Sequence, residues 1–445
     1  MQTGLSALRI AESSAGQIFN RLNEIYKRTV RAANDINDPN ARASLQREIN
    51  NLVDAIQKIG TDTEYNGIKL LDGTFSNKYI HYGPKYGQTV EVNIGDVRAQ
   101  SLGAHIVSGN GRFTAGTGAI STADTNYLLQ GNDHLRVAGQ TVLRGGQTPV
   151  LVDAATAARN INTNATLQSL GIEAVAKNKS VGAHFTGVIR SDDQNASVEL
   201  RFFVGAKDVN APSFRITNVK ANTTLSELVT QINSQASATG TPITARAENG
   251  RLVLETTNGE TIAIEAVVTV SGNNTATVNF SQLIQDVGDV SGLGNNNNTA
   301  HAIRVGELQI FGTESFVVNE YGIDIVGPTP NIVDESITST FNNLYSIDVS
   351  TNQSAEMATL IVKKALQRVD TIRAQIGAVM NNLQSIYDAQ KVAQDNTKEA
   401  ENVIRNTDYA QEMSNFTKLQ IKIQSSMAML AQANQLPQLV LQLLR

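Results

Sequence analysis

The carboxyl-terminal part of the chain carries a long stripe of apolar residues with the spacing of a coiled coil. Between residues 362 and 386 the apolar positions are alternately three and four apart, which places them on one face of a helix. Proline is absent from residues 352–436 and the only glycine there is Gly377, so we expect one long helix or two end to end. The stripe comprises Val362, Ala365, Val369, Ile372, Ile376, Val379, Leu383 and Ile386. The opposite, solvated face is predicted to carry Lys363, Lys364, Arg368, Asp370, Arg373 and Asn381.

The amino-terminal residues 1–33 repeat the same pattern and predict the partner of that stripe. Both segments have a 3.5-residue period, so the two helices can supercoil together. The apolar positions are Leu8, Ala11, Ala15, Ile18, Leu22, Ile25, Thr29 and Ala32. The Asn- and Asp-rich segment 34–39 ends this helix at a proline. A third helix is predicted over 40–59, ended by Gly60, with a stripe of Leu45, Ile49, Leu52, Ile56 and Ile59.

A second apolar phase begins in the carboxyl-terminal arm beyond residue 408. Residues 423–444 form an uncharged run of a length that could span a membrane. Five glutamines, Asn434 and Pro437 make this run too polar for lipid, so we predict no membrane insertion. We interpret it as a helix whose polar and apolar faces both contact protein. The phase starts with Tyr409, Met413, Phe416, Ile423, Met427 and Leu430.

The middle of the chain, residues 104–343, has the period and turn residues of β-structure. Strands are predicted at 198–204, 213–219, 243–248, 252–256 and 262–270, and before them at 79–82 and 90–94. Asn-Gly dipeptides at 249–250 and 258–259 each predict a hairpin. Short helices at 154–161 and 225–232 each follow a strand pair, which suggests two repeated modules. Residues 295–298 are interpreted as a polyamide linker and 303–325 as a further strand pair, closed by Pro328 and Pro330.

These patterns predict an α+β multidomain protein. The amino- and carboxyl-terminal arms form a long antiparallel helical coiled coil or bundle, and β-rich outer domains are inserted between them. We expect segments 1–103, 104–343, 344–407 and 408–445, with the insertion pointing away from the arms. A rod of this kind buries only part of its stripes within one molecule, which leaves the rest for copies of itself.

Composition and motifs give no support for catalysis or ligand chemistry. The net charge of −5 is mild, so nothing suggests nucleic acid as a partner. The chain has no cysteine, which excludes disulfides and thiolate metal sites. Its five histidines are scattered, and no metalloprotease, dinucleotide, Walker or Gly-x-Ser-x-Gly motif occurs. We therefore expect no enzyme activity, cofactor or metal.

Short motifs at both ends of the chain resemble those of bacterial flagellin. Residues 408–415 read DYAQEMSN, and residues 430–438 read LAQANQLPQ close to the end of the chain. Near the other end, residues 63–71 read TEYNGIKLL, with Tyr65 where phenylalanine is usual in that family. The resemblance covers about residues 1–103 and 344–445. Within the middle, residues 225–232 and 245–256 look like the repeated insert of many flagellins.

The resemblance implies a structural subunit of the helical filament of the bacterial flagellum, located outside the cell. It implies export unfolded through the flagellar type III apparatus, with an export chaperone and the filament cap protein as partners. The helix-bundle core would comprise Leu8, Ile18, Leu22, Ile25, Leu45, Ile49, Leu52, Val369, Ile372, Ile376, Val379, Leu383 and Ile386. Filament assembly would use Tyr409, Met413, Phe416, Ile423, Met427, Leu430, Leu436, Val440, Leu443 and Leu444. A hook–filament junction protein and a secreted adhesin on a flagellin-like scaffold stay open as alternatives.

Two departures from the family pattern lead to further expectations. Flagellins usually have a segment with an LSTG-like element before the point where this chain starts, so we expect the partner of residues 409–445 to be missing. That tail should then be poorly ordered in solution.

The second departure lies in the patch that many flagellins present to Toll-like receptor 5. Glu24 replaces an arginine and Arg28 a leucine, while Glu48 matches, so we expect weak receptor activation. Glu24 and Arg28 are equally consistent with a plain solvated helix face.

Overall fold

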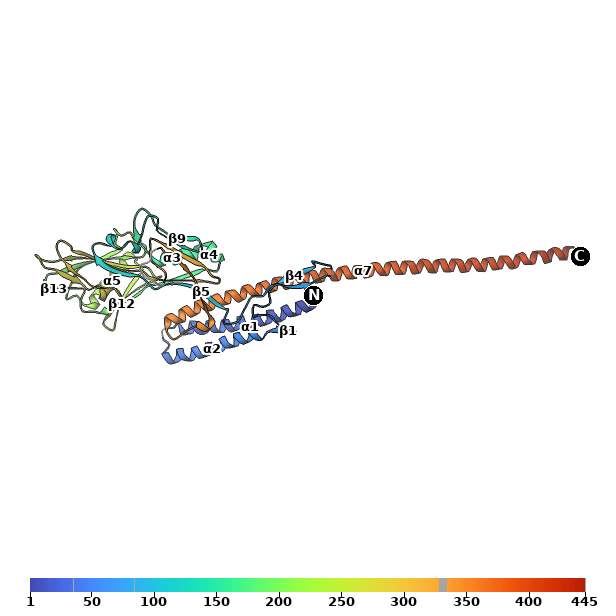
Figure 1. Cartoon of the computed structure of the whole chain (residues 1–445), viewed down its shortest axis with the longest axis horizontal. Coiled ribbons are helices and arrows are strands. Elements are labelled where there is room, and N and C mark those ends of the chain that lie inside the picture. Colours follow the sequence, from blue (N-terminus) through green and yellow to red (C-terminus); the bar gives the residue numbers. More distant parts are fainter. Residues whose placement is uncertain (35, 84, 328–333, 445) are drawn as a thin grey trace.

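The chain has three parts: a β-rich outer domain at one end, a bundle of helices, and a single helix that extends far beyond the bundle (Figure 1). The computed structural model describes all residues except 35, 84, 328–333 and 445, and nothing is described of the side chains of residues 407 and 408. This arrangement confirms the predicted α+β architecture, with helical arms from the two ends of the chain and a β-rich insertion between them.

Three helices form the bundle: α1 (Gln2–Ala32), α2 (Pro39–Asp62) and α7 (Asn352–Leu443). Helices α1 and α7 lie side by side and antiparallel. At one end Gln2 Nε2 donates to the Tyr387 hydroxyl at 3.2 Å, and further along Arg373 Nη2 lies 2.8 Å from Glu12 Oε1. α7 is one uninterrupted helix of 92 residues that includes Pro437. Gly60 does not end α2 as predicted, because the backbone stays helical for two further residues.

Two of the three bundle helices, α2 and α7, start with a side-chain cap, whereas α1 has none. The Asp38 carboxylate accepts the Ala41 N–H at 2.6 Å, with Pro39 in the first turn, where its missing N–H costs no helical hydrogen bond. Thr351 caps α7, where its side chain accepts the Ser354 N–H and the Ser354 side chain accepts the Thr351 N–H.

The predicted stripes lie in the apolar core of the bundle. Ten of the thirteen expected core residues are buried: Leu8, Ile18, Leu22, Ile25, Leu45, Ile49, Val369, Ile372, Ile376 and Leu383. Leu52 and Val379 are partly buried and pack against the same core, and Val53 is the more buried neighbour of Leu52. Ile386 is half-buried, because it lies beside the first residues of α1, where the bundle ends.

Two hairpins follow α2 and lie along the bundle. The first joins β1 (Glu64–Tyr65) to β2 (Ile68–Lys69), with Asn66 and Gly67 at φ 51° and 77°, as an Asn-Gly turn requires. The second pairs β3 (Lys78–His81) with β4 (Thr89–Val92). The chain then leaves the bundle through β5 (Gly103–Gly109) and returns through β25 (Thr340–Asn343). These two strands pair antiparallel, with Gly103 opposite Asn343.

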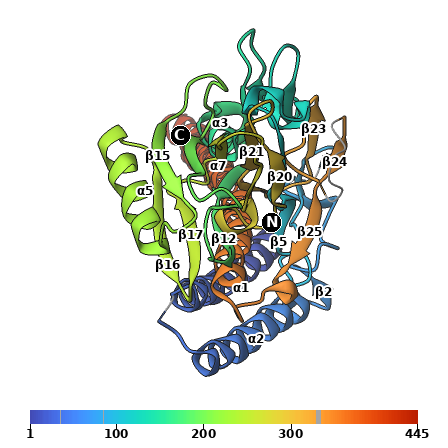
Figure 2. The ribbon, with the colours of Figure 1, turned by 90° about the vertical axis from the view of Figure 1, so that its left-hand side faces the viewer.

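The outer domain contains three larger sheets, and strands of each are labelled in Figure 2. The first, which adjoins the bundle, has the order β11-β22-β5-β25: Glu173–Lys177, Glu307–Gly312, Gly103–Gly109 and Thr340–Asn343. The second has the order β15-β14-β18-β21-β6: Phe214–Lys220, Ser197–Val204, Ile262–Thr269, Thr299–Arg304 and Phe113–Thr117. The third has the order β24-β23-β8-β9: Ser336–Thr338, Val317–Tyr321, His134–Val137 and Gln140–Arg144.

Smaller elements complete the outer domain. Two three-stranded sheets have the orders β12-β17-β16 (Lys179–His184, Arg251–Thr256, Ile243–Glu248) and β13-β19-β20 (Ile189–Ser191, Ala276–Val278, Val290–Leu293). β7 (Leu128–Leu129) pairs with β10 (Val150–Leu151). The short helices are α3 (Ala154–Thr163), α4 (Ala165–Ser169), α5 (Leu225–Thr239), α6 (Phe280–Leu283), η1 (Ile120–Thr122), η2 (Thr125–Tyr127) and η3 (Leu344–Ser346).

The five-stranded sheet separates two apolar cores of the outer domain. Adjacent residues of a strand point to opposite faces, so Phe202 of β14 lies in one core and Phe203 in the other. On the paired strand β18, Ile264 lies in the same core as Phe202, and Ala263 lies in the same core as Phe203. This sheet therefore makes the insertion a two-core body rather than a row of independent hairpins.

The two helices predicted to belong to repeated modules share one hydrogen-bond pattern. Asn162, near the end of α3, donates to the Ala174 carbonyl at 2.8 Å and accepts the Ala174 N–H at 2.8 Å. Asn233 of α5 makes the same pair of bonds with Ala245, also at 2.8 Å. In each case the amide ties a helix to the strand that follows it.

Several loop predictions in the middle region are wrong. Asn258-Gly259 does not turn a hairpin, because β17 and β18 belong to different sheets. Residues 295–298 are not a linker but belong to a tight turn, in which Gly294 and Asn297 exchange backbone hydrogen bonds. Residues 303–325 contribute to β21, β22 and β23 in three separate sheets, not to one pair. Pro328 and Pro330 lie outside the described residues.

Candidate assembly surfaces on the helical arms

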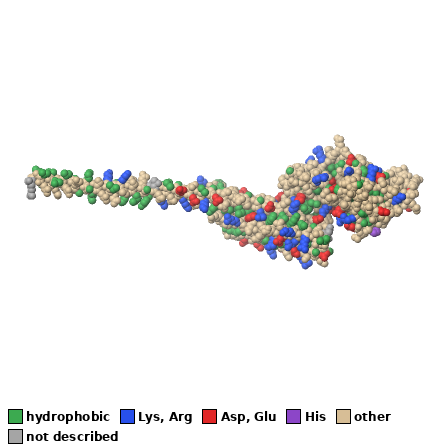
Figure 3. Space-filling model, turned by 180° about the vertical axis from the view of Figure 1, so that it is seen from behind, with side chains coloured by type: hydrophobic (Ala, Val, Ile, Leu, Met, Phe, Trp, Pro, Cys, Tyr) green, Lys and Arg blue, Asp and Glu red, His purple; other side chains and the backbone are tan. Residues whose placement is uncertain are grey.

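The second half of α7 extends beyond the bundle as a bare helix, seen as the long projection in Figures 1 and 3. From residue 391 onward every side chain whose burial is described is exposed. This exposed part of the helix is roughly 80 Å long, at about 1.5 Å per residue. All ten residues predicted for filament assembly lie on this tail, with exposed fractions from 45% for Met413 to 85% for Leu443. They are Tyr409, Met413, Phe416, Ile423, Met427, Leu430, Leu436, Val440, Leu443 and Leu444.

An apolar surface of this size is unusual on a soluble monomer and typically marks an interaction surface. Leu419, Ile421, Met429, Leu439 and Leu441 are also exposed there, so apolar side chains occur all around the helix rather than in one stripe. A helix that is apolar on several faces is suited to a site between several neighbouring helices. The expected poor order of the tail in solution stays a prediction.

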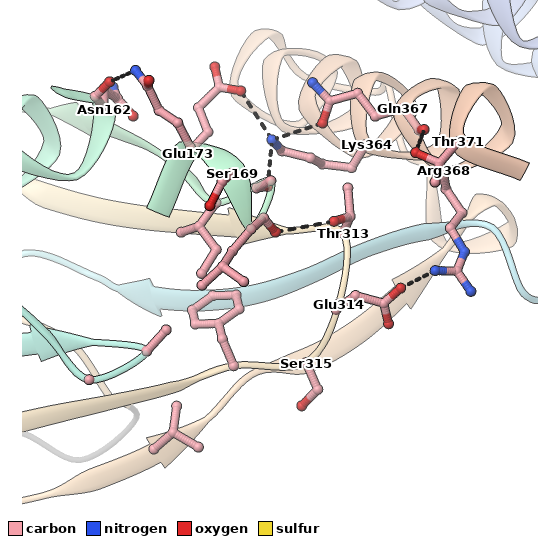
Figure 4. Close-up of a pocket in the computed structure, with 18 residues that line it drawn as sticks. Asn162, Ser169, Glu173, Thr313, Glu314, Ser315, Lys364, Gln367, Arg368 and Thr371 are labelled. Carbon is pink, nitrogen blue, oxygen red and sulfur yellow. Dashed lines mark hydrogen bonds and ion pairs between the residues drawn. The ribbon is translucent and has the colours of Figure 1, made fainter. Parts of the chain in front are cut away.

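The joint between the outer domain and α7 is ionic. An open cavity of about 1100 Å³ lies between the start of α7 and the outer domain, where residues 168–173 and 313–317 form much of its lining (Figure 4). Lys364 is only 2% exposed, and its ammonium donates to the Gly171 carbonyl at 3.0 Å and to Glu173 and Gln367 at 3.2 Å. Lys363 binds the same carboxylate at 2.8 Å.

The charges at this joint shift one another's pKa values. Burial lowers the pKa of Lys364, and the neighbouring Glu173 offsets only part of that effect. Burial would raise the pKa of Glu173, but the hydrogen bond from Lys363 and the charges of both lysines leave it below its usual value. Two further ion pairs, Arg368–Glu314 and Lys177–Glu356, also connect α7 to the outer domain.

The interpretation of the charged α7 residues as a purely solvated face is therefore wrong for the start of that helix. The outer domain covers Lys364, and Arg373 packs between Glu12 and the Phe19 ring, whose centroid lies 5.4 Å from the guanidinium carbon. Sequence periodicity could not find these contacts, because it identifies the face toward α1 but not a second face toward an inserted domain. The adjacent lysines at 363–364 were the sequence feature from which this contact with the outer domain could have been predicted.

The residues at the receptor-patch positions form an ion-pair network between α1 and α2. Arg28 Nε lies 2.7 Å from Glu48 Oε2, and Arg28 Nη1 lies 4.0 Å from Glu24 Oε2. The Arg28 guanidinium also donates to the Glu24 backbone carbonyl at 3.1 Å. Glu24, Arg28 and Glu48 thus lie together on one partly exposed surface, where the guanidinium is already bound by acid.

Within the described part of the chain, no three His, Asp or Glu side chains come close enough to hold a metal ion. Among the same residues, no helix combines the length and the apolar character that a membrane span needs.

A long helical rod with an apolar tail and an outward β-domain defines a class of structural proteins that assemble through their helices. Comparisons with known proteins identify the family. The bacterial flagellin N-terminal helical region matches residues 1–76 and the C-terminal helical region matches residues 359–444. The flagellin hook IN motif matches residues 203–258 in the outer domain.

Two flagellins match this chain along its whole length. The flagellin of Aquifex pyrophilus is 46% identical over 450 residues, which cover 100% of this chain and 87% of that one. The flagellin of Aquifex aeolicus is 42% identical over 466 residues, with the same coverage. The FliC structure from Burkholderia pseudomallei aligns with 85% of this chain and 99% of that one, at 16% identity and a TM-score of 0.33.

The chain therefore belongs to the bacterial flagellin family. It is a structural subunit of the flagellar filament.

Proposed function

We propose that the ten exposed apolar residues of the α7 tail are the contacts through which copies of this chain assemble into the filament. The observation that supports this is their exposure on a helix that has no neighbour in the described chain beyond the bundle. Burying one large apolar side chain contributes roughly 1.5–3 kcal/mol. Coverage of several such residues by sister helices can offset the entropy lost when subunits associate.

The same geometry supports different roles for the two ends of the molecule. The outer domain lies at the end of the molecule opposite the tail (Figure 1). We infer that the tail supplies the contacts between subunits and that the outer domain projects from the filament. We infer that the chain works outside the cell and has no enzymatic activity. We also propose that nucleic acid is not among its partners and that the chain does not insert into a membrane.

The tail also explains why other flagellar proteins would bind this chain. An apolar helix of this kind needs cover before assembly, because exposed apolar surface promotes aggregation. We therefore infer that an export chaperone covers the tail before secretion and that a cap protein guides each copy to the filament end. A hook–filament junction protein and an adhesin are less well supported, because matches to flagellin regions occur at both ends of the chain and in the middle.

The experiment is assembly of the full chain with two apolar tail residues changed to acids, F416D/L430D. We expect the wild type to form long filaments on seeds, as seen by electron microscopy, and the variant to stay in the soluble fraction. The matched control is Q194D/N273D, which adds the same charge at two exposed positions of the outer domain. Filaments from F416D/L430D at the wild-type yield would contradict the assignment of the tail.

A further inference from the structure

A cluster of cationic side chains lies on the solvent face of the third sheet of the outer domain. His134 and Arg136 of β8 and Arg144 of β9 point outward, while their neighbours Leu135 and Leu143 are buried. This alternation is that of strands with one face on the core. The outward side chains surround a hollow of about 250 Å³, lined by Asn132, His134, Arg136, Thr141 and Arg144.

Strand register brings these residues together. His134 is directly opposite Arg144, and Arg136 is opposite Thr141, with a bulge between the two pairs. Opposite residues of antiparallel strands have Cβ atoms about 4.5–5.5 Å apart, so the two guanidiniums and the imidazole share one surface. On the other side, Tyr321 of β23 stacks on His134 with ring centroids 5.3 Å apart and an interplanar angle of 17°.

The two arginines have no acidic partner among the described residues, in contrast to several other arginines of the same domain. Arg201 is held by Glu199 and Glu265, and Arg246 by Glu248 and Glu255. The side chains of Arg136 and Arg144 make no hydrogen bond or ion pair within the described ranges, and only their backbones are bonded, within the sheet. Like charges held close together repel, so a site of this kind is stabilised by an added anion.

Asp133, which precedes His134, and Asp334, whose charge raises the pKa of Asp133, both accept backbone hydrogen bonds. Asp133 accepts the Gln130 N–H at 2.9 Å, and Asp334 accepts the Gly322 N–H at 3.1 Å. His134 Nδ1 lies 2.8 Å from the Asn132 carbonyl oxygen. That oxygen can only accept, so Nδ1 donates to it and Nε2 is left for another partner.

We propose that this hollow binds an oxyanion, a sulfate or phosphate group, carried by a sugar polymer or free in solution. The guanidinium forks match the oxygens of such a group, and the Thr141 hydroxyl and the Asn132 amide add neutral hydrogen-bond donors. The stacked His134 and Tyr321 rings form an aromatic edge beside the charges, against which the carbon face of a sugar packs. The site lies on the outer domain, which the filament presents to its surroundings.

The test is binding of a heparin-derived hexasaccharide and of inorganic sulfate to the full chain, measured by isothermal titration calorimetry. The test variant is R136A/R144A, which removes two exposed side chains without touching the core. The matched control is R190A/R251A, which removes two other exposed arginines of the outer domain that have no described ion pair. A Y321A variant, compared using both ligands, separates recognition of the sugar from recognition of the anion.

We expect the hexasaccharide to bind the wild type and the control alike, and R136A/R144A at least tenfold more weakly. If Y321A weakens the binding of the hexasaccharide but not of sulfate, the bound anion is carried by a sugar polymer. If sulfate binds with the same affinity as the hexasaccharide, and Y321A changes neither affinity, the site binds the free ion. Equal losses in the test and control variants, or no binding to the wild type, would overturn the proposal.

Discussion

At the scale of single residues, Glu320 stands out as a carboxyl group held inside the outer domain. It is 4% exposed, and its Oε1 accepts the N–H groups of Ile325 at 2.8 Å and Val326 at 2.7 Å. Burial raises the pKa of Glu320 to about 8, since these two bonds and the charge of Arg112 only partly offset the desolvation. The group is therefore protonated in the folded chain at pH values where an unfolded chain would ionise it.

This predicts a loss of outer-domain stability with rising pH. Between the ordinary Glu pKa and about 8 the folded state binds more protons than the unfolded state, so the free energy of unfolding falls as pH rises. The stabilising contribution is complete below the unfolded pKa and is lost as pH passes the folded pKa. In the neutral variant E320Q this part of the slope should vanish. Denaturant unfolding of the wild type and of E320Q from pH 5 to pH 9 measures this slope. Over that range we expect the change in the free energy of unfolding to differ between the two proteins by something on the order of a few kcal/mol.

The control for this experiment is an acid whose carboxylate is not buried. E91Q changes an exposed residue of β4 and should leave the slope of the wild type unchanged. Burial also raises the pKa values of Asp153 and Glu307. Both acids therefore add to the fall of the free energy of unfolding with pH, in the wild type and in E320Q alike. Identical pH profiles for E320Q and the wild type would show that Glu320 does not titrate in this range.

Single residues also show how far local sequence reasoning reaches. The two Asn-Gly dipeptides have the same local sequence, yet only residues 249–250 turn a hairpin, with φ values of 50° and 72°. At 258–259 only the glycine has a positive φ, and the chain passes from one sheet to another. The dipeptide favours a turn, but whether the flanking strands pair depends on which other strands compete for them.

At the scale of elements, the contact between α1 and α7 holds the two ends of the chain together. The stripe of α1 is buried along its whole length, from Leu5 to Ala32. Most helical stability in proteins comes from packing of such a face rather than from intrinsic propensity. The bundle should therefore be sensitive to the volume of the stripe residues and insensitive to residues beside it.

We predict that I18A destabilises the bundle by about 2–5 kcal/mol, because it removes methyl groups at a site with no exposed surface. The matched control is I10A on the same helix, where the side chain is 38% exposed and the change should be within about 0.5 kcal/mol. Urea unfolding followed by far-ultraviolet circular dichroism measures both. Equal losses in the two variants would mean that the stripe does not carry the packing.

At the scale of the whole molecule, the surface at the receptor-patch positions combines two helices. Arg28 of α1 is bound to Glu48 of α2, and Glu24 lies on the same surface. A partner that needs Glu48 would have to compete with the guanidinium. A charge in place of an apolar anchor weakens an interface as well.

We therefore predict weak activation of Toll-like receptor 5 by this chain in reporter cells. The double change E24R/R28L, which releases Glu48 and restores the usual residue types, should raise the potency at least tenfold. The matched control K78L/E91R makes equivalent changes on the exposed β3–β4 hairpin and should have no effect. Full potency of the wild-type chain would contradict this prediction.

The sequence alone determined the helical arms, most strand positions and the family. Helical stripes and strand alternation are local patterns, because backbone geometry repeats every 3.6 or two residues. The end motifs are contiguous stretches and need no tertiary information. For these reasons the two arms and most of their core residues could be predicted before any coordinates.

Only the tertiary structure decided which polar residues meet across the molecule. Lys364 and Glu173 lie 191 positions apart, and Arg136 and Tyr321 come to one surface only through the strand order of the third sheet. Such contacts depend on how the inserted domain folds back on α7 and on itself. The physical reason is that periodicity identifies a buried face but does not say what covers it.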